Sequence, residues 1–308
     1  MKKTNKAIVL LNMGGARNKN ELKIFLTNMF NDKNILSMPA PLRKIIAYFI
    51  VKSRLDSAWE NYELIGNESP INKLTEKLVN KVNDKIDEYK TYQIMRYTPP
   101  FANDVIKQMK DDGISEVILL PLYPQYSTTT TKSSLEDFQM YAKDAFNVRV
   151  IDPYYKNESF NNCIIDEISS QVTDPKEYNL IFSAHGLPQK IVDAGDPYEK
   201  QMNEQVDILK EMLEKKGLNF KSISLAYQSK VGPLKWLEPS LDDALKDFKE
   251  QNVLIYPIAF IVDNSETDFE LSIEYKEIAE EIGIHDYKVC KCVNDSDAFV
   301  EVIKEIIK

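Results

Sequence analysis

The sequence predicts an α/β fold made of two similar Rossmann-like lobes, each a four-stranded parallel sheet flanked by helices. Two observations lead to this expectation. Short apolar runs alternate with longer amphipathic segments along all 308 residues, a pattern typical of βαβ units around a parallel sheet. The second half of the chain also repeats the order of motifs found in the first half.

Eight apolar runs of strand length follow one another along the chain. They span residues 7–12, 91–96, 116–121, 148–152, 179–184, 222–227, 253–259 and 287–291. The segments between them carry apolar residues at helical spacing, as in 72–88, 132–146, 198–216 and 265–282. Both halves therefore read as strands joined by helical crossovers.

The two halves correspond where their strands end. AIVLLNMGG corresponds to NLIFSAHGLP, and VILLPLYPQYS corresponds to VLIYPIAFIVDNS. We expect an N-terminal lobe of residues 1–152, with an inserted segment as the lip of a cleft, and a C-terminal lobe of residues 153–308, whose last helix can pack back on the first lobe. Ligands bind beyond the carboxyl ends of parallel strands, so two facing lobes would surround one active cleft.

Composition excludes several classes of function. Lys and Arg number 39 against 48 Asp and Glu, and the net charge of −9 argues against nucleic acid as a partner. Three cysteines without a CxxC pair indicate a reducing, cytoplasmic location rather than a disulfide scaffold. No apolar stretch reaches the roughly 20 residues of a membrane span, and the first apolar run is too short for a signal peptide.

His185 is the first candidate for chemistry. It is one of two histidines and follows the apolar run 180–182 at the end of a predicted strand. A neutral imidazole there could be a general base or a metal ligand, or a structural histidine in a turn. His285 follows no apolar run and is expected in a surface loop.

Glu266, Glu270 and Glu274 lie four residues apart, on one face of a predicted helix. Such a row of carboxylates could accept protons or pass a hard cation inward. The alternative is an ordinary amphipathic helix with a solvated acidic side, begun by a capping box of Ser265 and Asp268. The helix starts at a strand end, which favours a role in the cleft.

Three loops allow more than one interpretation. Residues 13–15 (MGG) follow a strand but lack the glycine spacing of nucleotide-binding loops. Residues 123–131 (YPQYSTTTT) could be a hydroxyl-rich binding loop or a polar connection. Residues 41–54 place cations beside apolar residues, which suits a lid, an apolar lip of the cleft, a membrane-surface helix or ordinary core packing.

Several long blocks resemble one enzyme family. LIFSAHGLPQKIVDAGDPY (180–198) is similar to the signature of ferrochelatases, which insert ferrous iron into a porphyrin. LLNMGG (10–15), RYTPP (96–100), LYPQYSTTTT (122–131), YQSKVGPLKWLEPS (227–240) and PIAFIVDNSETDFELSIEY (257–275) resemble further family blocks, in the family order. The resemblance covers nearly the whole chain.

The resemblance implies roles for particular residues. His185 resembles the essential histidine, and Glu266 resembles the carboxylate facing it across the porphyrin plane, so both are expected to act in catalysis and to contact the metal. Glu270, Glu274 and Asp263 match a row that guides metal or protons. The residues expected to bind the porphyrin are Met13, Arg96, Tyr97, Tyr123, Ser183 and Trp236.

The same resemblance implies a substrate and a mechanism. The MGG start is similar to the protoporphyrin-using branch, so ferrous iron and protoporphyrin IX are the expected substrates, with protohaem and two protons as products. The cleft is expected to bend the macrocycle, because a flat ring points its nitrogen lone pairs inward. No permanently bound cofactor is implied, and three cysteines argue against a [2Fe-2S] cluster.

Two residues depart from the family pattern, and the sequence also allows other functions. Asn264 stands where many relatives carry a second histidine, and Tyr227 replaces a frequent tryptophan. The alternatives are a coproporphyrin III ferrochelatase, a cobalt chelatase of the same fold, and a non-catalytic tetrapyrrole or haem carrier. Peripheral membrane contact through residues 41–54 is a further possibility.

Overall fold

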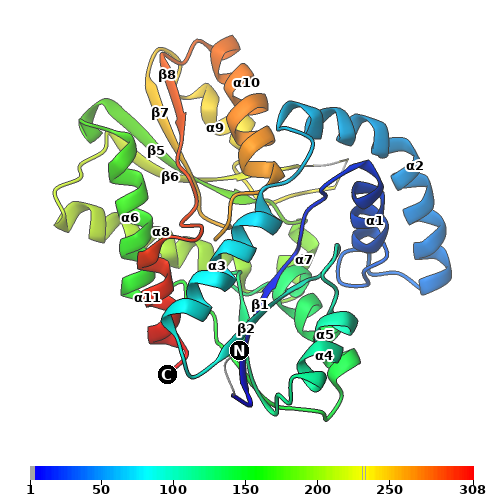
Figure 1. Cartoon of the computed structure of the whole chain (residues 1–308). Coiled ribbons are helices and arrows are strands. Elements are labelled where there is room, and N and C mark those ends of the chain that lie inside the picture. Colours follow the sequence, from blue (N-terminus) through cyan, green and yellow to red (C-terminus); the bar gives the residue numbers. More distant parts are fainter. Residues whose placement is uncertain (1–3, 231, 233) are drawn as a thin grey trace. The chain divides into compact units, whose positions relative to one another are not determined.

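The computed structural model of the chain describes residues 4–230, 232 and 234–308 (Figure 1). Residues 1–3 of the predicted first lobe, and residues 231 and 233 of the block 227–240, lie outside the described residues. The chain divides into two compact units. The first unit holds the residues up to Tyr123 together with Ser127–Asp152 and Asp295–Lys308, and the second holds Pro124–Tyr126 and Pro153–Asn294.

The first unit is built on a parallel sheet of order β2-β1-β3-β4. Its strands are β1 (Lys6–Asn12), β2 (Lys90–Met95), β3 (Glu116–Pro121) and β4 (Asn147–Val150). Residues 7–11 of β1 have no exposed surface, as expected for a central parallel strand covered on both faces. Its helices are α1 (Lys19–Phe30), α2 (Ala40–Leu64), α3 (Ile71–Lys85), α4 (Ala102–Asp111), η1 (Thr128–Lys132), α5 (Ser133–Ala142) and α11 (Asp297–Ile306).

The second unit repeats this arrangement with a parallel sheet of order β6-β5-β7-β8. Its strands are β5 (Tyr178–His185), β6 (Ser222–Gln228), β7 (Asn252–Pro257) and β8 (Asp286–Val289). Its helices are α6 (Glu158–Gln171), η2 (Pro175–Glu177), α7 (Gln189–Asp193), α8 (Tyr198–Lys215), α9 (Leu241–Lys246), η3 (Glu266–Glu274) and α10 (Tyr275–Ile282). The expected fold class, with a four-stranded parallel sheet in each half, is confirmed.

Local sequence signals begin and end these helices. The side chains of Asn18 and Ser296 cap α1 and α11 by accepting hydrogen bonds from backbone N–H groups of the first turn. Gly283 ends α10 with a φ of 89°, a left-handed conformation that favours glycine. The last helix, α11, packs against α3 within the first unit (Figure 1).

Residues 41–54 lie in helix α2, which has one side packed in the core and another side exposed. It packs against α1 through its inner side, where Ala47 and Val51 are buried. Its other side exposes more than half of the surface of Ile45, Tyr48 and Phe49. In the described part of the chain, no helix is long and apolar enough to cross a membrane.

Candidate active site

The register of the second sheet positions His185. His185 is the last residue of β5 and pairs with Gln228, the last residue of β6. The next residue, Gly186, donates its N–H to the Gln228 carbonyl at 2.9 Å. A Cβ at Gly186 would lie 2.9 Å from that carbonyl oxygen, so only glycine lets the chain pass this close. The carboxyl ends of β5 and of the edge strand β6 are thereby held together beside the histidine.

His185 forms a direct pair with Glu266, which lies at the start of η3. His185 Nδ1 is 2.8 Å from Glu266 Oε2. Because a carboxylate only accepts, Nδ1 carries the hydrogen, and Nε2 is the nitrogen left for a proton from a substrate. In this structure the two groups contact each other directly, and the expectation that they flank a bound porphyrin from opposite faces stays a prediction.

The carboxylates control the protonation of His185. Burial favours the neutral imidazole, but the charge and hydrogen bond of Glu266, together with the charge of Glu270, outweigh it and raise the pKa of His185 to about 9. The His185 side chain nevertheless keeps 39% of its surface exposed, so a ligand can reach it. The site can therefore store a proton on an accessible imidazole.

Two residues at a predicted strand end, to which the sequence analysis assigned no role, hold Glu266 and Glu270. Gln228 Nε2 lies 3.4 Å from Glu266 Oε2 and 3.3 Å from Glu270 Oε2. The Ser229 hydroxyl donates to Glu270 Oε2 at 2.6 Å. Their position directly after a predicted strand was the available signal, because strand ends collect functional side chains.

Two of the three carboxylates in this row, Glu270 and Glu274, have raised pKa values. Burial, and then the nearby charge of Glu266, raise the pKa of Glu270 to about 7. Partial burial and the charges of Asp242 and Glu277 also raise the pKa of Glu274. Glu266, Glu270 and Glu274 thus form an electrostatically linked series, and the reading as an ordinary solvated helix face does not hold for Glu270.

The helix that carries this row is not an ordinary α-helix. Glu266–Glu274 forms a π-helix before α10 begins. π-Helical segments are rare and are frequently found at functional sites. The expected capping box of Ser265 and Asp268 is also wrong, because Asn264 caps this end: its Oδ1 accepts the Glu266 N–H at 2.8 Å.

Asp263 is not brought into this series. Its carboxylate accepts hydrogen bonds from the Cys292 N–H and the Asn294 side chain, each at 2.9 Å. Lys291 Nζ lies 3.6 Å from the same carboxylate. These contacts fasten the segment after β7 to the segment after β8, so a structural role accounts for Asp263.

The other residues predicted in the second unit have different surroundings. Ser183 has no exposed surface, and its hydroxyl donates to Gln228 Oε1 at 2.7 Å, which does not fit direct contact with a porphyrin. Trp236 is partly exposed and forms a β-bridge with Pro188, close to Gly186.

The backbone of His185 has a further hydrogen bond. The Tyr198 hydroxyl donates to the His185 carbonyl at 2.9 Å. His285 is exposed, as expected for a surface loop.

In the first unit, the predicted residues Met13, Arg96 and Tyr97 meet where β1 and β2 end. Tyr97 donates its N–H to the Met13 carbonyl at 3.0 Å. The Arg96 guanidinium and the Tyr97 hydroxyl both bond to the buried Asp32 carboxylate, at 3.0 and 3.1 Å. Tyr123 is partly buried, with its hydroxyl 3.4 Å from Ser134 Oγ. Asp32 was not predicted, because no strand end or motif marks it.

The two glycines after Met13 serve close packing. Gly14 has a φ of +83°, and a Cβ on it would lie 2.3 Å from Thr98 Oγ1. A Cβ on Gly15 would lie 2.5 Å from the Ser69 Cβ. Close packing therefore accounts for both glycines.

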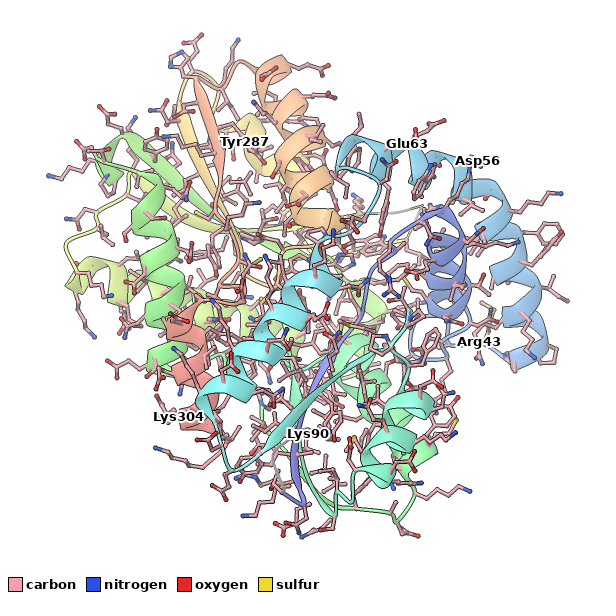
Figure 2. The ribbon with its side chains drawn as sticks, viewed as in Figure 1. Arg43, Asp56, Glu63, Lys90, Tyr287 and Lys304 are labelled. Carbon is pink, nitrogen blue, oxygen red and sulfur yellow. The ribbon has the colours of Figure 1, made fainter. Side chains whose placement is uncertain are left out.

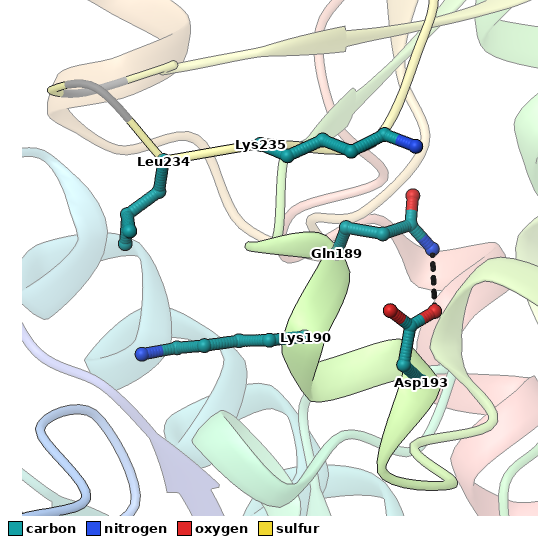
Figure 3. A pocket seen from close by; sticks show the side chains of 5 residues that line it. All are labelled: Gln189, Lys190, Asp193, Leu234 and Lys235. Carbon is teal, nitrogen blue, oxygen red and sulfur yellow. Dashed lines mark hydrogen bonds between the residues drawn. The ribbon is translucent and has the colours of Figure 1, made fainter.

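A surface pocket of about 390 Å³ lies beside α7 (Figure 3). It is lined by Gln189, Lys190, Asp193, Leu234 and Lys235, and Gln189 donates to Asp193 at 3.1 Å. The lining includes neither His185 nor Glu266. Within the described residues, no group of three or more His, Cys, Asp or Glu side chains is arranged to hold a metal ion.

Comparison with known proteins gives one consistent result. The family model described as Ferrochelatase matches residues 5–308. The chain is 49% identical to the ferrochelatase of Sulfurimonas denitrificans, over 97% of each chain. It is 50% identical to that of Nitratiruptor sp., over 98% of each chain. It is 40% identical to that of Helicobacter pylori, over 100% of this chain and 94% of that one.

Solved structures share the fold at low sequence identity. SirB from Bacillus subtilis with Fe3+ aligns with a TM-score of 0.61 and 8% identity, over 98% of this chain and 94% of that one. CbiX, described as the terminal enzyme for siroheme biosynthesis in denitrifying bacteria, aligns with a TM-score of 0.51 and 12% identity, over 98% of this chain and 97% of that one. These likenesses support the two-sheet architecture.

Proposed function

The chain belongs to the ferrochelatase family, and we propose that it inserts ferrous iron into protoporphyrin IX to give protohaem and two protons. The observation that carries the proposal is the accessible His185 imidazole, hydrogen-bonded through Nδ1 to Glu266 at 2.8 Å. Metal insertion must remove two protons from pyrrole nitrogens, and the His185–Glu266 pair is suited to accept protons. Iron enters as a substrate.

The proton path begins at Nε2 of His185. In the neutral imidazole Nε2 has a lone pair, because Nδ1 carries the hydrogen shared with Glu266. A pyrrole proton taken at Nε2 creates an imidazolium that Glu266 stabilises by its charge. Glu270, whose pKa of about 7 lies near neutrality, is suited to accept the next proton. The same carboxylates attract a divalent cation.

The remaining predicted residues have supporting roles in this proposal. We assign Met13, Arg96, Tyr97, Tyr123 and Trp236 to contact with the macrocycle. Ser183 is left out of this set, because it is fully buried. Asp263 is left out of the relay, because its hydrogen bonds are made to residues 292–294.

We propose that no resident cofactor takes part. Cys163, Cys290 and Cys292 are buried, and burial raises the pKa of each thiol. Metal clusters bind thiolates, which these surroundings disfavour. Metal and sulfide analysis of the protein purified without oxygen tests this point, and stoichiometric iron and sulfide would contradict it.

A metallation assay tests the function. Purified protein, protoporphyrin IX and Fe²⁺ should give haem in many turnovers under anaerobic conditions, followed by absorbance. Replacing His185 with Ala should abolish turnover while porphyrin binding remains, and Glu266→Gln should strongly reduce it. A single stoichiometric spectral shift would instead indicate a carrier. Faster turnover of coproporphyrin III would reassign the substrate, and turnover only with Co²⁺ would indicate a cobalt chelatase.

We also propose a cytoplasmic protein that touches the membrane surface through α2. The exposed side chains Leu42, Ile45, Tyr48 and Phe49 lie in the half of this helix that carries Arg43, Lys44, Lys52 and Arg54. The other half carries Asp56, Glu60 and Glu63, and Figure 2 labels Arg43 apart from Asp56 and Glu63 along α2. Apolar side chains with flanking cations suit an anionic lipid surface.

A matched pair of variants on α2 tests the membrane contact. Phe49→Ser should reduce co-sedimentation with vesicles that contain phosphatidylglycerol. Leu64→Ser removes an equally exposed apolar side chain from the acidic end of the same helix and should have no effect. Equal losses in both variants, or no binding by the unmodified protein, would contradict the proposal.

A further inference from the structure

Gln228 is a buried amide that contacts both reactive carboxylates. It has no exposed surface, and its backbone is fixed by pairing with His185 and Gly186. Its Nε2 reaches one oxygen of Glu266 and one oxygen of Glu270, at 3.4 and 3.3 Å. An amide can face these carboxylates with its NH₂ group or with its oxygen, and only the NH₂ group can donate to them.

The hydroxyl of Ser183 favours one of these two orientations of the Gln228 amide. Its hydroxyl lies 2.7 Å from Gln228 Oε1, on the side away from the carboxylates. A hydroxyl can donate to an amide oxygen or accept from an amide N–H, whereas a carboxylate only accepts, so the three partners together place Oε1 toward Ser183 and the NH₂ group toward Glu266 and Glu270. Ser183 and Gln228 are both fully buried, so water does not compete for this hydrogen bond.

The donors converge on one oxygen of each carboxylate. Oε2 of Glu266 takes the hydrogen bond of His185, and Oε2 of Glu270 takes that of Ser229. Gln228 contacts the same two oxygens. Among the described residues, the hydrogen bonds to these two side chains are all made to Oε2, which leaves Oε1 of each for substrate, for iron or for a proton in transit.

We propose that Ser183 is a positioning residue: it fixes the amide of Gln228 so that Gln228 holds Glu266 and Glu270 each by Oε2 and leaves Oε1 for the reaction. The catalytic consequence rests on the proposed function, whereas the orientation itself does not. A flipped amide would turn its oxygen toward two carboxylates, and the resulting repulsion would displace Glu266 from His185. Groups that orient reactive side chains typically change rates by about 10- to 100-fold.

Ser183→Ala removes one hydroxyl and tests the proposal, with Ser224→Ala as its control. Ser224 lies on the neighbouring strand, opposite Ile181, and its buried hydroxyl has no hydrogen-bond partner among the described residues. Ser183→Ala should lower kcat about tenfold with little change in the KM for protoporphyrin IX. Ser224→Ala should change neither value. A raised KM with unchanged kcat would restore direct porphyrin contact by Ser183 and overturn the proposal.

A double-mutant cycle tests whether Ser183 acts through Gln228. In a Gln228→Leu background, Ser183→Ala should have no further effect on kcat, because no amide remains to be oriented. Independent, additive losses would overturn the proposal. Circular dichroism and thermal unfolding of each variant establish that it is folded.

Proton NMR gives a readout that does not require catalysis. The Nδ1 hydrogen shared by His185 and Glu266 should resonate far downfield, and His185→Asn identifies it. The resonance should shift or broaden in Ser183→Ala and stay in place in Ser224→Ala. If the unmodified protein makes no haem but the resonance responds in this way, the proposed function fails while the positioning role stands. An unchanged resonance in Ser183→Ala overturns the positioning role.

Discussion

Replacing Glu270 with Gln should make the stability of the second unit less dependent on pH. Burial, and then the charge of Glu266, raise the pKa of Glu270 from 4.5 to about 7 in the folded protein. The folded state therefore prefers the protonated carboxyl. The stability that this preference contributes is complete below the ordinary pKa and is lost as the pH rises toward 7. A glutamine in its place has no proton to lose.

The magnitude follows from the two pKa values. By linkage, the raised pKa of Glu270 lowers the free energy of unfolding by about 1 kcal/mol at about pH 5 and by about 3 kcal/mol at about pH 7. The free energy of unfolding of Glu270→Gln should thus rise relative to that of the unmodified protein by about 2 kcal/mol between these pH values. With a pKa of about 9, His185 remains protonated over this range and adds little to the difference.

Urea unfolding measures this difference. Of the two tryptophans, Trp236 lies in the second unit, so both proteins carry Trp59→Phe and fluorescence reports on that unit. Glu280→Gln, which removes an exposed carboxylate of α10, should give the same difference at both pH values. A Glu270→Gln difference that also stays constant within about 0.5 kcal/mol would refute the reasoning from burial.

Three further predictions concern other groups. The kcat/KM for metallation should rise with pH up to about 9, because only neutral His185 accepts a proton, and a bell centred near pH 6 would contradict this. Gly15→Ala should cost about 1 to 3 kcal/mol in urea unfolding, because its Cβ would collide with Ser69; unchanged stability would refute the close packing. Asp32→Asn should lower stability by about 3 kcal/mol by leaving Arg96 without its buried partner, and a thermal melting temperature equal to that of the unmodified protein would refute it.

The strands were within reach of the sequence, but their order in each sheet was not predicted. Continuous apolar runs such as 7–11 predict buried parallel strands, because a strand covered on both faces needs no alternation. The matched motifs also predict two similar sheets. Helix boundaries were less accessible, since Ser133 rather than residue 132 begins α5, and a π-helix cannot be distinguished from an α-helix by apolar spacing alone.

The site was only partly predictable. His185, Glu266 and Glu270 are marked by residue type, by position and by family resemblance. The hydrogen bonds of Gln228 depend on the register of β5 and β6, which residue spacing does not specify. The direct contact between His185 and Glu266 was not predicted, because resemblance identifies residues without giving the distance between them.

The repeated strand order makes the two sheets comparable residue by residue. Leu11 pairs with Pro121 in one sheet as Ser183 pairs with Pro257 in the other, so Met13 occupies the place that His185 holds in its own sheet. One copy of this architecture thus places a thioether, which cannot titrate, directly after its central strand β1, and the other ends its central strand β5 in an imidazole that can titrate. In the proposed function, acid–base chemistry therefore belongs to one of the two similar sheets, and the matching position in the other sheet contributes only by contact.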